Sequence, residues 1–265
     1  MDKKEILRGV IRKNYAHVAG GSAKGCCSGG CGCGGKPVSA GDAAQRIGYS
    51  QDDVTGAPSG ANMGLGCGNP LAIASLKAGE TVLDLGCGGG FDCFLARRQV
   101  GESGHVIGVD MTPEMVALAR GNAEKSGYNN IEFRLGEIEH LPVADGTADV
   151  ILSNCVINLA LDKRQVFLEA FRVLRPGGRL SISDVVAEKP LPKELKNDPA
   201  LVSGCIGGAE YVENIRAMLQ AAGFCDIVLK PKEQSREIIR SWGFEGNLEE
   251  YVGSYEIQAR KPEKA

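Results

Sequence analysis

The segment Val82–Asp92, VLDLGCGGGFD, constrains the fold of this chain more than any other. The apolar run that ends at Leu85 predicts a buried strand, and a helical pattern resumes near residue 90. Between them, Gly86, Gly88 and Gly90 predict a tight turn, because glycine adopts positive φ freely and lets a ligand approach the backbone. A strand, a glycine turn and a helix in direct succession indicate a βαβ fold with a ligand site at the turn.

Strands and helices alternate from this segment onward. We expect strands over 81–85, 105–109, 131–135, 148–153 and 179–185, and helices over about 90–99, 113–126 and 163–174. This alternation predicts an α/β fold with a Rossmann-like, doubly wound and mostly parallel sheet. Farther along, a helix over 211–222 precedes two apolar runs, 224–230 and 251–259, which we expect to pair antiparallel at the sheet edge.

The first sixty residues have a different character. Residues 3–18 predict an amphipathic helix, whereas 20–41 are dominated by Gly, Ser and Cys and predict a flexible segment. A loop is expected over about 57–70 and a helix over 71–76, so that the ordered domain begins near residue 60. We therefore divide the chain into an N-terminal helix with a Gly/Cys-rich segment (1–60), a core (61–185), and an insert with the C-terminal region (186–265).

The distribution of charged and apolar residues disfavours some classes of function. The net charge of −3 comes from 30 basic and 33 acidic residues that are mixed along the chain, so no basic footprint for a nucleic acid is present. No apolar run approaches the roughly 18 residues that span a membrane, and the N-terminus lacks the apolar stretch of a signal peptide. We expect a cytoplasmic monomer that acts on a small molecule.

The glycine turn favours one class of nucleotide over another. Its spacing, G-x-G-x-G, departs from the dinucleotide pattern G-x-G-x-x-G, which weighs against NAD. Asp110 ends the second strand 24 residues after Gly86, where a carboxylate can accept hydrogen bonds from both ribose hydroxyls. Glu137, just past the third strand, is expected near an adenine edge. The alternative is that Asp110 only starts a helix and the glycines only form a turn.

At these residues the chain resembles the S-adenosylmethionine-dependent methyltransferases of the Rossmann-like fold, over about residues 60–185. The resemblance implies that Asp84 anchors the loop and that Asp110 binds the ribose. It also implies methionyl contacts from Gly86, Gly88 and Gly90, and adenine contacts from Met111, Glu137 and Ile138. Tyr15 of the first helix is expected to fold over the methyl donor. Amino-group methyltransferases usually carry an Asn-Pro-Pro-aromatic signature after the fourth strand, and SNCVIN stands there instead, which does not favour a nitrogen acceptor.

Three isolated cysteines point to the acceptor. Cys67, Cys155 and Cys205 lie in GLGCGNP, SNCVINL and SGCIGGA, and each is expected at the carboxyl end of the sheet, where ligands bind in this fold. The alternative, a small buried apolar role, is favoured for Cys87, Cys93 and Cys225. Zinc is disfavoured, because the three cysteines are scattered rather than in C-x-x-C pairs and no histidine is near them.

Three thiolates match a soft, three-coordinate centre with one lone pair, and trivalent arsenic is such a centre. The three cysteine strings, with GVDMTPEM and LGEIEHLPV, resemble the arsenite methyltransferase family over about residues 64–210. The resemblance implies that Cys67, Cys155 and Cys205 bind As(III), delivered free or as a glutathione conjugate, and present its lone pair to the methyl of S-adenosylmethionine. It also implies a thiol reductant, glutathione or thioredoxin.

Two other functions stay open at this point. One is a methyltransferase that acts on another small molecule, such as a quinone, sterol or thiol, with structural cysteines. The other is a non-enzymatic thiol scavenger or sensor of metalloids. The segment CCSGGCGCGG contains Cys26, Cys27, Cys31 and Cys33, which are candidates for a metal-capture arm, for a redox partner of Cys67, or for incidental thiols in a disordered tail.

Overall fold

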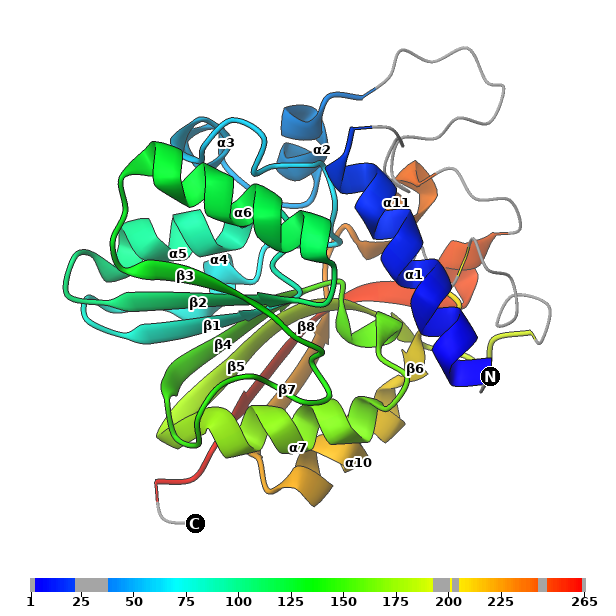
Figure 1. Ribbon diagram of the computed structural model, residues 1–265. Helices are drawn as coiled ribbons and strands as arrows, with labels where there is room; N and C mark the ends of the chain where they lie inside the picture. Colours follow the sequence, from blue (N-terminus) through cyan, green and yellow to red (C-terminus); the bar gives the residue numbers. More distant parts are fainter. Residues whose placement is uncertain (1–2, 22–37, 193–200, 202–204, 243–246, 264–265) are drawn as a thin grey trace.

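The computed structural model describes residues 3–21, 38–192, 201, 205–242 and 247–263 (Figure 1). Its centre is an eight-stranded sheet in the order β3-β2-β1-β4-β5-β8-β7, with the short β6 paired to β5. The strands are β1 (Thr81–Leu85), β2 (His105–Asp110), β3 (Ile131–Leu135), β4 (Ala148–Asn154), β5 (Leu174–Ala187), β6 (Glu210–Tyr211), β7 (Cys225–Pro231) and β8 (Val252–Arg260). All pairs are parallel except those that β8 makes with β5 and β7. The predicted fold class and the antiparallel edge are confirmed.

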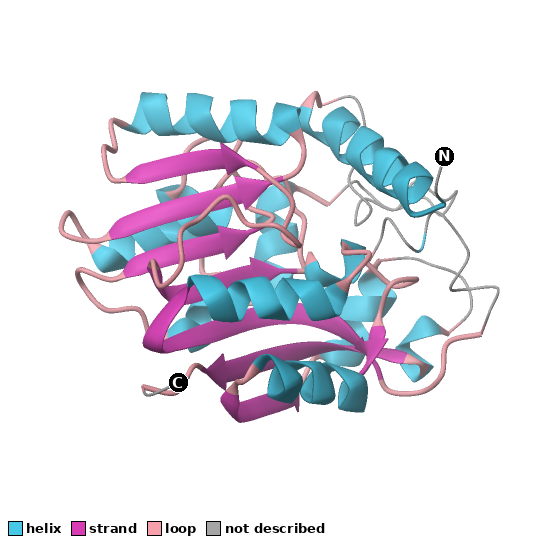
Figure 2. Cartoon of the chain, turned by 60° about the horizontal axis from the view of Figure 1, so that its bottom comes forward, coloured by secondary structure: helices cyan, strands magenta, loops and turns pink. Residues whose placement is uncertain are grey.

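Helices cover both faces of the sheet (Figure 2). They are α1 (Lys3–Ala19), α2 (Ala40–Arg46), α3 (Gln51–Gly56), α4 (Leu71–Ala74), α5 (Phe91–Val100), α6 (Pro113–Ser126), α7 (Lys163–Val173), α10 (Val212–Ala222) and α11 (Ser235–Ser241), with 3-10 turns η1 (Ile157–Leu159) and η2 (Leu248–Glu250). One buried cluster holds residues of α5, α6 and α11, and a second holds residues of α7 and α10. The sheet therefore separates two cores, as expected of a doubly wound fold.

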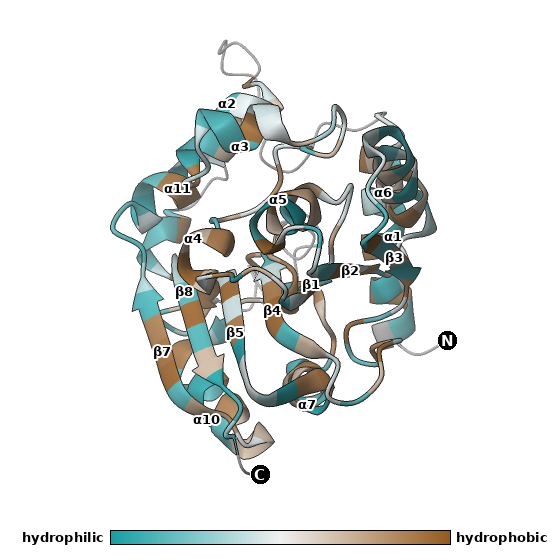
Figure 3. Ribbon diagram, turned by 90° about the vertical axis from the view of Figure 1, so that its left-hand side faces the viewer, coloured by the Kyte–Doolittle hydropathy of each residue, from teal (hydrophilic) through white to brown (hydrophobic). Residues whose placement is uncertain are grey.

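The central strands are apolar because both of their faces are covered. Residues 82–85 of β1 are all buried, and so are 150–153 of β4. A strand buried on both faces needs nearly continuous apolar residues rather than alternation. Figure 3 shows this contrast, with brown segments on the strands and teal on the outer helices α2 and α3.

One strand begins earlier than predicted. The sequence predicted a helix over about 163–174 and a strand over 179–185, but α7 ends at Val173 and β5 begins at Leu174. The register explains the difference, since Leu174 pairs with Ala148 while Arg179 pairs with Val150. The extra residues of β5 around Pro176 have no paired residue on β4 and form a bulge.

Helices α2 and α3 were missed, and the expectation that the ordered part begins near residue 60 is wrong. Ser39 and Ser50 cap them: the Ser39 hydroxyl accepts from the Asp42 N–H, and Ser50 forms a capping box with Asp53. Both caps have the Ser-x-x-Asp spacing that begins helices, so the signal was present in the sequence. Between the two helices lies Tyr49, which is buried.

The remaining N-terminal expectations have mixed outcomes. Helix α1 and the loop over 57–70 are confirmed. Cys26, Cys27, Cys31 and Cys33 lie outside the described residues. Helix α1 packs against α6 and lies beyond the carboxyl ends of the strands (Figure 1). Among the described helices, none combines the length and apolar character that a membrane crossing requires.

Candidate active site

A pocket of about 1310 Å³, including its opening to solvent, lies at the carboxyl ends of β1, β2 and β4. Its walls combine the glycine loop with Asp84, Asp92, Asp110, Met111 and Ile138, and with Cys155 and Cys205. Tyr15 and Arg8 of α1 also line it. Most of the predicted donor residues and two of the three cysteines therefore face one cavity.

The glycine loop turns sharply between β1 and α5. Gly86, Gly88 and Gly90 all have positive φ, and the N–H groups of Gly86 and Cys87 donate to the Val109 carbonyl. A Cβ on Gly86 would collide with Val156. Gly90 does not line the pocket, and its Cβ would meet Phe94 and Phe133 at 2.9 Å. Gly90 is therefore required for packing of the helix start, whereas Gly86 and Gly88 face the cavity.

Asp110 ties the loop to the end of β2. Its carboxylate accepts the Gly88 N–H at 3.0 Å and the Thr112 N–H at 2.8 Å. Burial raises the pKa of Asp110, while these two hydrogen bonds lower it. Thr112, not Asp110, is the residue that precedes α6. The reading of Asp110 as a simple helix start is thus replaced by a role in the cavity wall.

Glu137 lies differently from its predicted place at an adenine edge. It is outside the pocket lining and pairs with Arg8 at 3.4 Å and Arg12 at 3.5 Å, which fastens α1 to the loop after β3. Its neighbour Glu139 is buried, lines the pocket and accepts the Leu161 N–H at 3.0 Å. Sequence reasoning missed Glu139, which has no motif of its own.

Two buried carboxyl groups lie beside the loop, and one of them was not predicted. Asp84, at the end of β1, accepts a hydrogen bond from the Cys93 thiol at 3.2 Å. Asp92, in the first turn of α5, accepts the Tyr49 hydroxyl at 2.6 Å. Burial raises the pKa of both, that of Asp92 to about 6. Cys93 is packed in the core, while Cys87 also lines the pocket.

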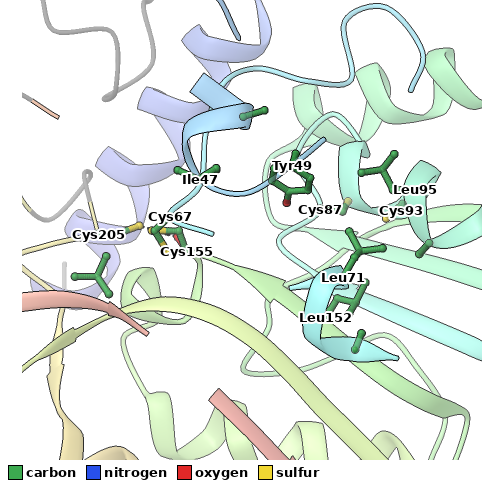
Figure 4. Close-up of a cluster of buried hydrophobic side chains, with 14 of the residues drawn as sticks. Ile47, Tyr49, Cys67, Leu71, Cys87, Cys93, Leu95, Leu152, Cys155 and Cys205 are labelled. Carbon is green, nitrogen blue, oxygen red and sulfur yellow. Dashed lines mark hydrogen bonds between the residues drawn. The ribbon is translucent and has the colours of Figure 1, made fainter. Parts of the chain in front are cut away.

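The three isolated cysteines lie close together (Figure 4), and two of them, Cys155 and Cys205, line the cavity. All are buried, and the Cys205 thiol donates to the Cys155 carbonyl at 2.7 Å. Hydrogen bonds with Cys205 and Cys67, followed by burial, raise the pKa of Cys155 well above its usual range. Cys155 and Cys205 both have positive φ, near 61° and 65°, a strain that persists only where surrounding contacts hold it.

Cys67 is held by partners far along the chain. Its N–H donates to the Asn154 side-chain oxygen at 3.1 Å, and the Ser254 hydroxyl donates to its carbonyl at 2.6 Å. The Asn154 amide also donates to the Gly68 carbonyl at 2.7 Å. A Cβ on Gly66 would meet Asn154 at 2.8 Å, so the string GLGCG keeps side chains out of a tightly packed turn.

Known proteins resemble this chain over much of its length. A family model described as a methyltransferase domain matches residues 76–223. An arsenite methyltransferase of Halobacterium salinarum is 50% identical over 97% of this chain and 67% of its own length. The chain belongs to the arsenite methyltransferase family. A human arsenite methyltransferase is 42% identical over 60% of this chain but only 44% of its own length.

A solved member of this family has the same fold. The crystal structure of an arsenic(III) S-adenosylmethionine methyltransferase from Chlamydomonas reinhardtii superposes with a TM-score of 0.61 and 34% identity, over 86% of this chain and 74% of the other. A phosphoethanolamine N-methyltransferase of Haemonchus contortus, at 21% identity, shares the fold alone.

In this family member a buried carboxyl group, Asp184 of β5, adjoins the thiols. One of its oxygens and the sulfurs of Cys67 and Cys155 all lie within 4.8 Å of one another. Asp184 accepts the N–H groups of Val185 at 2.7 Å and Ile157 at 2.9 Å. Burial nevertheless raises its pKa to about 7. Sequence reasoning missed Asp184, because no motif marks a carboxylate in the middle of a buried strand.

Two lysines offset the negative charge of this cluster of thiols and carboxylate. The Lys232 ammonium occupies the space that a Cβ on Gly68 would fill, close enough to Cys67 and Cys155 for their charges to interact. Lys163 interacts in the same way with Asp184 and Cys205. Burial lowers the pKa of both lysines. Trp242, the single tryptophan of the chain, also lines the pocket and belongs to the same buried cluster as the three thiols.

Proposed function

We propose that this protein transfers methyl groups from S-adenosylmethionine to trivalent arsenic bound by Cys67, Cys155 and Cys205. The observation that carries the proposal is that Cys155 interacts with both Cys67 and Cys205, while Cys155 and Cys205 line the same cavity as the glycine loop and Asp110. A quinone or sterol acceptor would gain nothing from three clustered thiols.

The cavity suits a cationic nucleoside donor. S-adenosylmethionine supplies an electrophilic methyl group on a sulfonium. Asp110, held by Gly88 and Thr112, would accept the ribose hydroxyls, and Met111 and Ile138 offer apolar walls for the adenine. Asp84 and Asp92 also line the cavity; burial raises the pKa of both carboxyl groups, and a bound sulfonium or ammonium would favour their ionised forms.

Arsenic binding by these thiols needs no separate base. The raised pKa of Cys155 means that it binds as a thiol. When As(OH)₃ enters, each As–S bond replaces an As–O bond, and the thiol proton leaves on the departing oxygen as water. A glutathione conjugate would exchange in the same way and release glutathione. Three As–S bonds leave arsenic with one lone pair.

Methyl transfer then depends on placement. The three buried thiols would hold arsenic at one site so that its lone pair faces the methyl group, and such positioning can be worth about 7–11 kcal/mol. The lone pair becomes the new As–C bond, and the C–S bond electrons stay with the departing sulfur. The product arsenic is pentavalent, so a thiol reductant, glutathione or thioredoxin, has to restore the trivalent state.

A cytoplasmic location is consistent with the thiol chemistry that we propose. The six described cysteines are all free. Free thiols persist in reducing compartments, which supports a cytoplasmic protein.

The test is product analysis with As(III), glutathione and methyl-labelled S-adenosylmethionine. Wild type and Cys225→Ser should form labelled methylarsenicals, since Cys225 lies on the outer strand β7, away from the cavity. Cys155→Ser should form none, although it still binds the donor. Unimpaired methylation by Cys155→Ser would refute the assigned arsenic site.

A further inference from the structure

The carboxyl group of Asp184 changes what the thiol cluster can bind. Arsenic(III) is satisfied by three thiolates, so it has no need of an oxygen ligand. Yet an Asp184 oxygen lies within 4.8 Å of both the Cys67 and the Cys155 sulfur, and all three residues are buried. Two sulfurs and one carboxylate oxygen form a donor set that suits a different kind of ion.

We propose that Cys67, Cys155 and Asp184 also form a binding site for a divalent cation of the zinc group, Zn²⁺ or Cd²⁺. The proposal goes beyond arsenic methylation and does not require it to occur, although the two sites share two thiols. It also reverses the expectation from sequence, which set zinc aside because the cysteines are scattered. The fold supplies the ligand that the spacing rule could not reveal.

Ligand geometry supports this assignment. Zinc binds cysteine sulfur at about 2.3 Å and carboxylate oxygen at about 2.0–2.2 Å in a tetrahedron. Two sulfurs on one zinc are therefore about 3.8 Å apart. The two sulfurs need to approach by no more than about 1 Å from the 4.8 Å limit to reach this separation, and a sulfur and the oxygen by no more than about 1.2 Å. The fourth position remains for water.

Hydrogen bonds from neighbouring groups orient the Asp184 carboxylate. Asp184 accepts hydrogen bonds from the N–H groups of Ile157 and Val185 and from the Asn158 amide at 3.0 Å. Such bonds fix ligating carboxylates in known metal sites. The Cys67 backbone is fixed as firmly, by Asn154 and Ser254. Two of the three ligand residues are thus oriented before any cation binds.

Charge balance also fits. Two thiolates, one carboxylate and a divalent cation leave one negative charge, and the Lys232 ammonium lies beside Cys67 and Cys155 to offset it. A buried charged site is tolerated only when it is compensated in this way.

The consequence is competition for the thiols. A zinc-group cation and arsenic cannot both use Cys67 and Cys155, so arsenic has to displace the cation before it is methylated. The two ions differ in what they need: the cation requires Asp184, and arsenic requires Cys205. Substitution of these two residues should separate the two binding events.

The test is a titration of the full, reduced chain with Zn²⁺ against a chromophoric chelator, and with Cd²⁺ monitored by thiolate charge-transfer absorption. Cys26, Cys27, Cys31 and Cys33 are replaced by Ser in every protein compared, so that the ion counted is not theirs. We expect one equivalent in this background and in its Cys225→Ser control, and release of that equivalent by As(III).

Two variants then distinguish the sites. Asp184→Asn should weaken Zn²⁺ binding by at least about tenfold and leave As(III) binding largely intact. Cys205→Ser should retain Zn²⁺ and lose tight As(III) binding. Less than one equivalent in the unsubstituted site, or unchanged Zn²⁺ affinity in Asp184→Asn, overturns the proposal.

Circular dichroism first establishes that Asp184→Asn is folded. If it is not, Cys205→Ser decides the question: retained Zn²⁺ supports the carboxylate site, and lost Zn²⁺ overturns it, because the ion would then use the three arsenic thiols. Absence of methylation by the metal-free wild type would refute the proposed function and leave these binding results unaffected.

Discussion

The donor end of the pocket and its thiol end are built in different ways. The donor end comes mainly from one continuous stretch, residues 84–111, whose loop is closed by hydrogen bonds between neighbours on β1 and β2. The thiol end combines residues from three distant loops, and a strand 187 residues away holds the Cys67 carbonyl. A local motif can define the first end, whereas the second exists only when the whole sheet has formed.

Substitutions at the two ends are therefore expected to have different effects. A change at Asp110 is expected to disturb the donor loop and to leave the thiols in place, because its carboxylate is bonded to Gly88 and Thr112. A change at Ser254 of β8 is expected to move Cys67, whose carbonyl accepts the Ser254 hydroxyl. Variants that separate donor binding from arsenic binding test this difference.

The largest expected effect comes from Cys67→Ser. Without the third thiol, arsenite is held less firmly, so the first methylation should fall at least about a thousandfold, since positioning supplies most of the rate. The second methylation should persist in part, because a methylated arsenic needs only two thiols, Cys155 and Cys205. Separate assays with arsenite and with a trivalent monomethylarsenical measure this. Equal loss of both steps would contradict the division of roles.

The next largest effect concerns pH and Asp184. Its pKa in the folded protein is about 7, against an ordinary value of 3.8, because burial disfavours its charge. The folded state thus holds this proton more tightly than the unfolded chain, and stability falls as pH rises from 3.8 to 7, by at most about 4 kcal/mol. Urea unfolding at pH 5 and pH 8 measures the fall. Asp184→Asn should flatten the dependence, and an unaltered slope would refute this assignment.

Asp110→Asn should act on the donor end alone. A hydrogen bond to a charged group contributes about 1.5–3 kcal/mol, so donor affinity should fall roughly tenfold to a hundredfold. Calorimetry with S-adenosylmethionine measures this, and As(III) binding should be unchanged. Asp145→Asn, at an exposed carboxylate paired with Arg172, is the matched control. Weakened arsenic binding in Asp110→Asn would mean that the two ends are not separate.

Asn154→Ala should give the smallest effect, about a tenfold slower first methylation, because Cys67 loses one of its backbone anchors. Asn154 is expected to act only by positioning Cys67. The effect of Asn154→Ala should therefore vanish in a Cys67→Ser background when the second methylation is measured. A double-mutant cycle gives this coupling. Additive losses would show that Asn154 acts through general stability instead.

The fold was predictable because its signals are local. Strands β1 and β3 and helix α6 have the predicted bounds. An apolar run defines each strand, and helix α6 begins at Pro113 and is followed by Gly127. Helices α2 and α3 were missed although their serine caps are visible, because the neighbouring Gly-rich segment made the whole region look irregular. The start of β5 was misplaced because a bulge has no sequence signature of its own.

The site was predictable only in part, because only some of its residues lie in local sequence motifs. The resemblance led to Asp110 and the three cysteines by their motifs. Asp92, Glu139, Asp184 and Tyr49 were missed, since each matters through contacts across the sheet. Glu137 was assigned by its position after β3, but it pairs with two arginines of α1 and does not line the cavity. A sequence motif shows which segment approaches a site, but not which side chain turns toward it.

The position of Trp242 has a practical consequence. It is the single tryptophan, it is buried, and it lines the pocket in the same cluster as the thiols. The emission of the wild-type chain is therefore a label-free optical signal from one known place. Entry of a heavy arsenic atom should quench it, and entry of the donor alone should change it differently. The order in which the two substrates load can then be followed in real time by stopped-flow mixing.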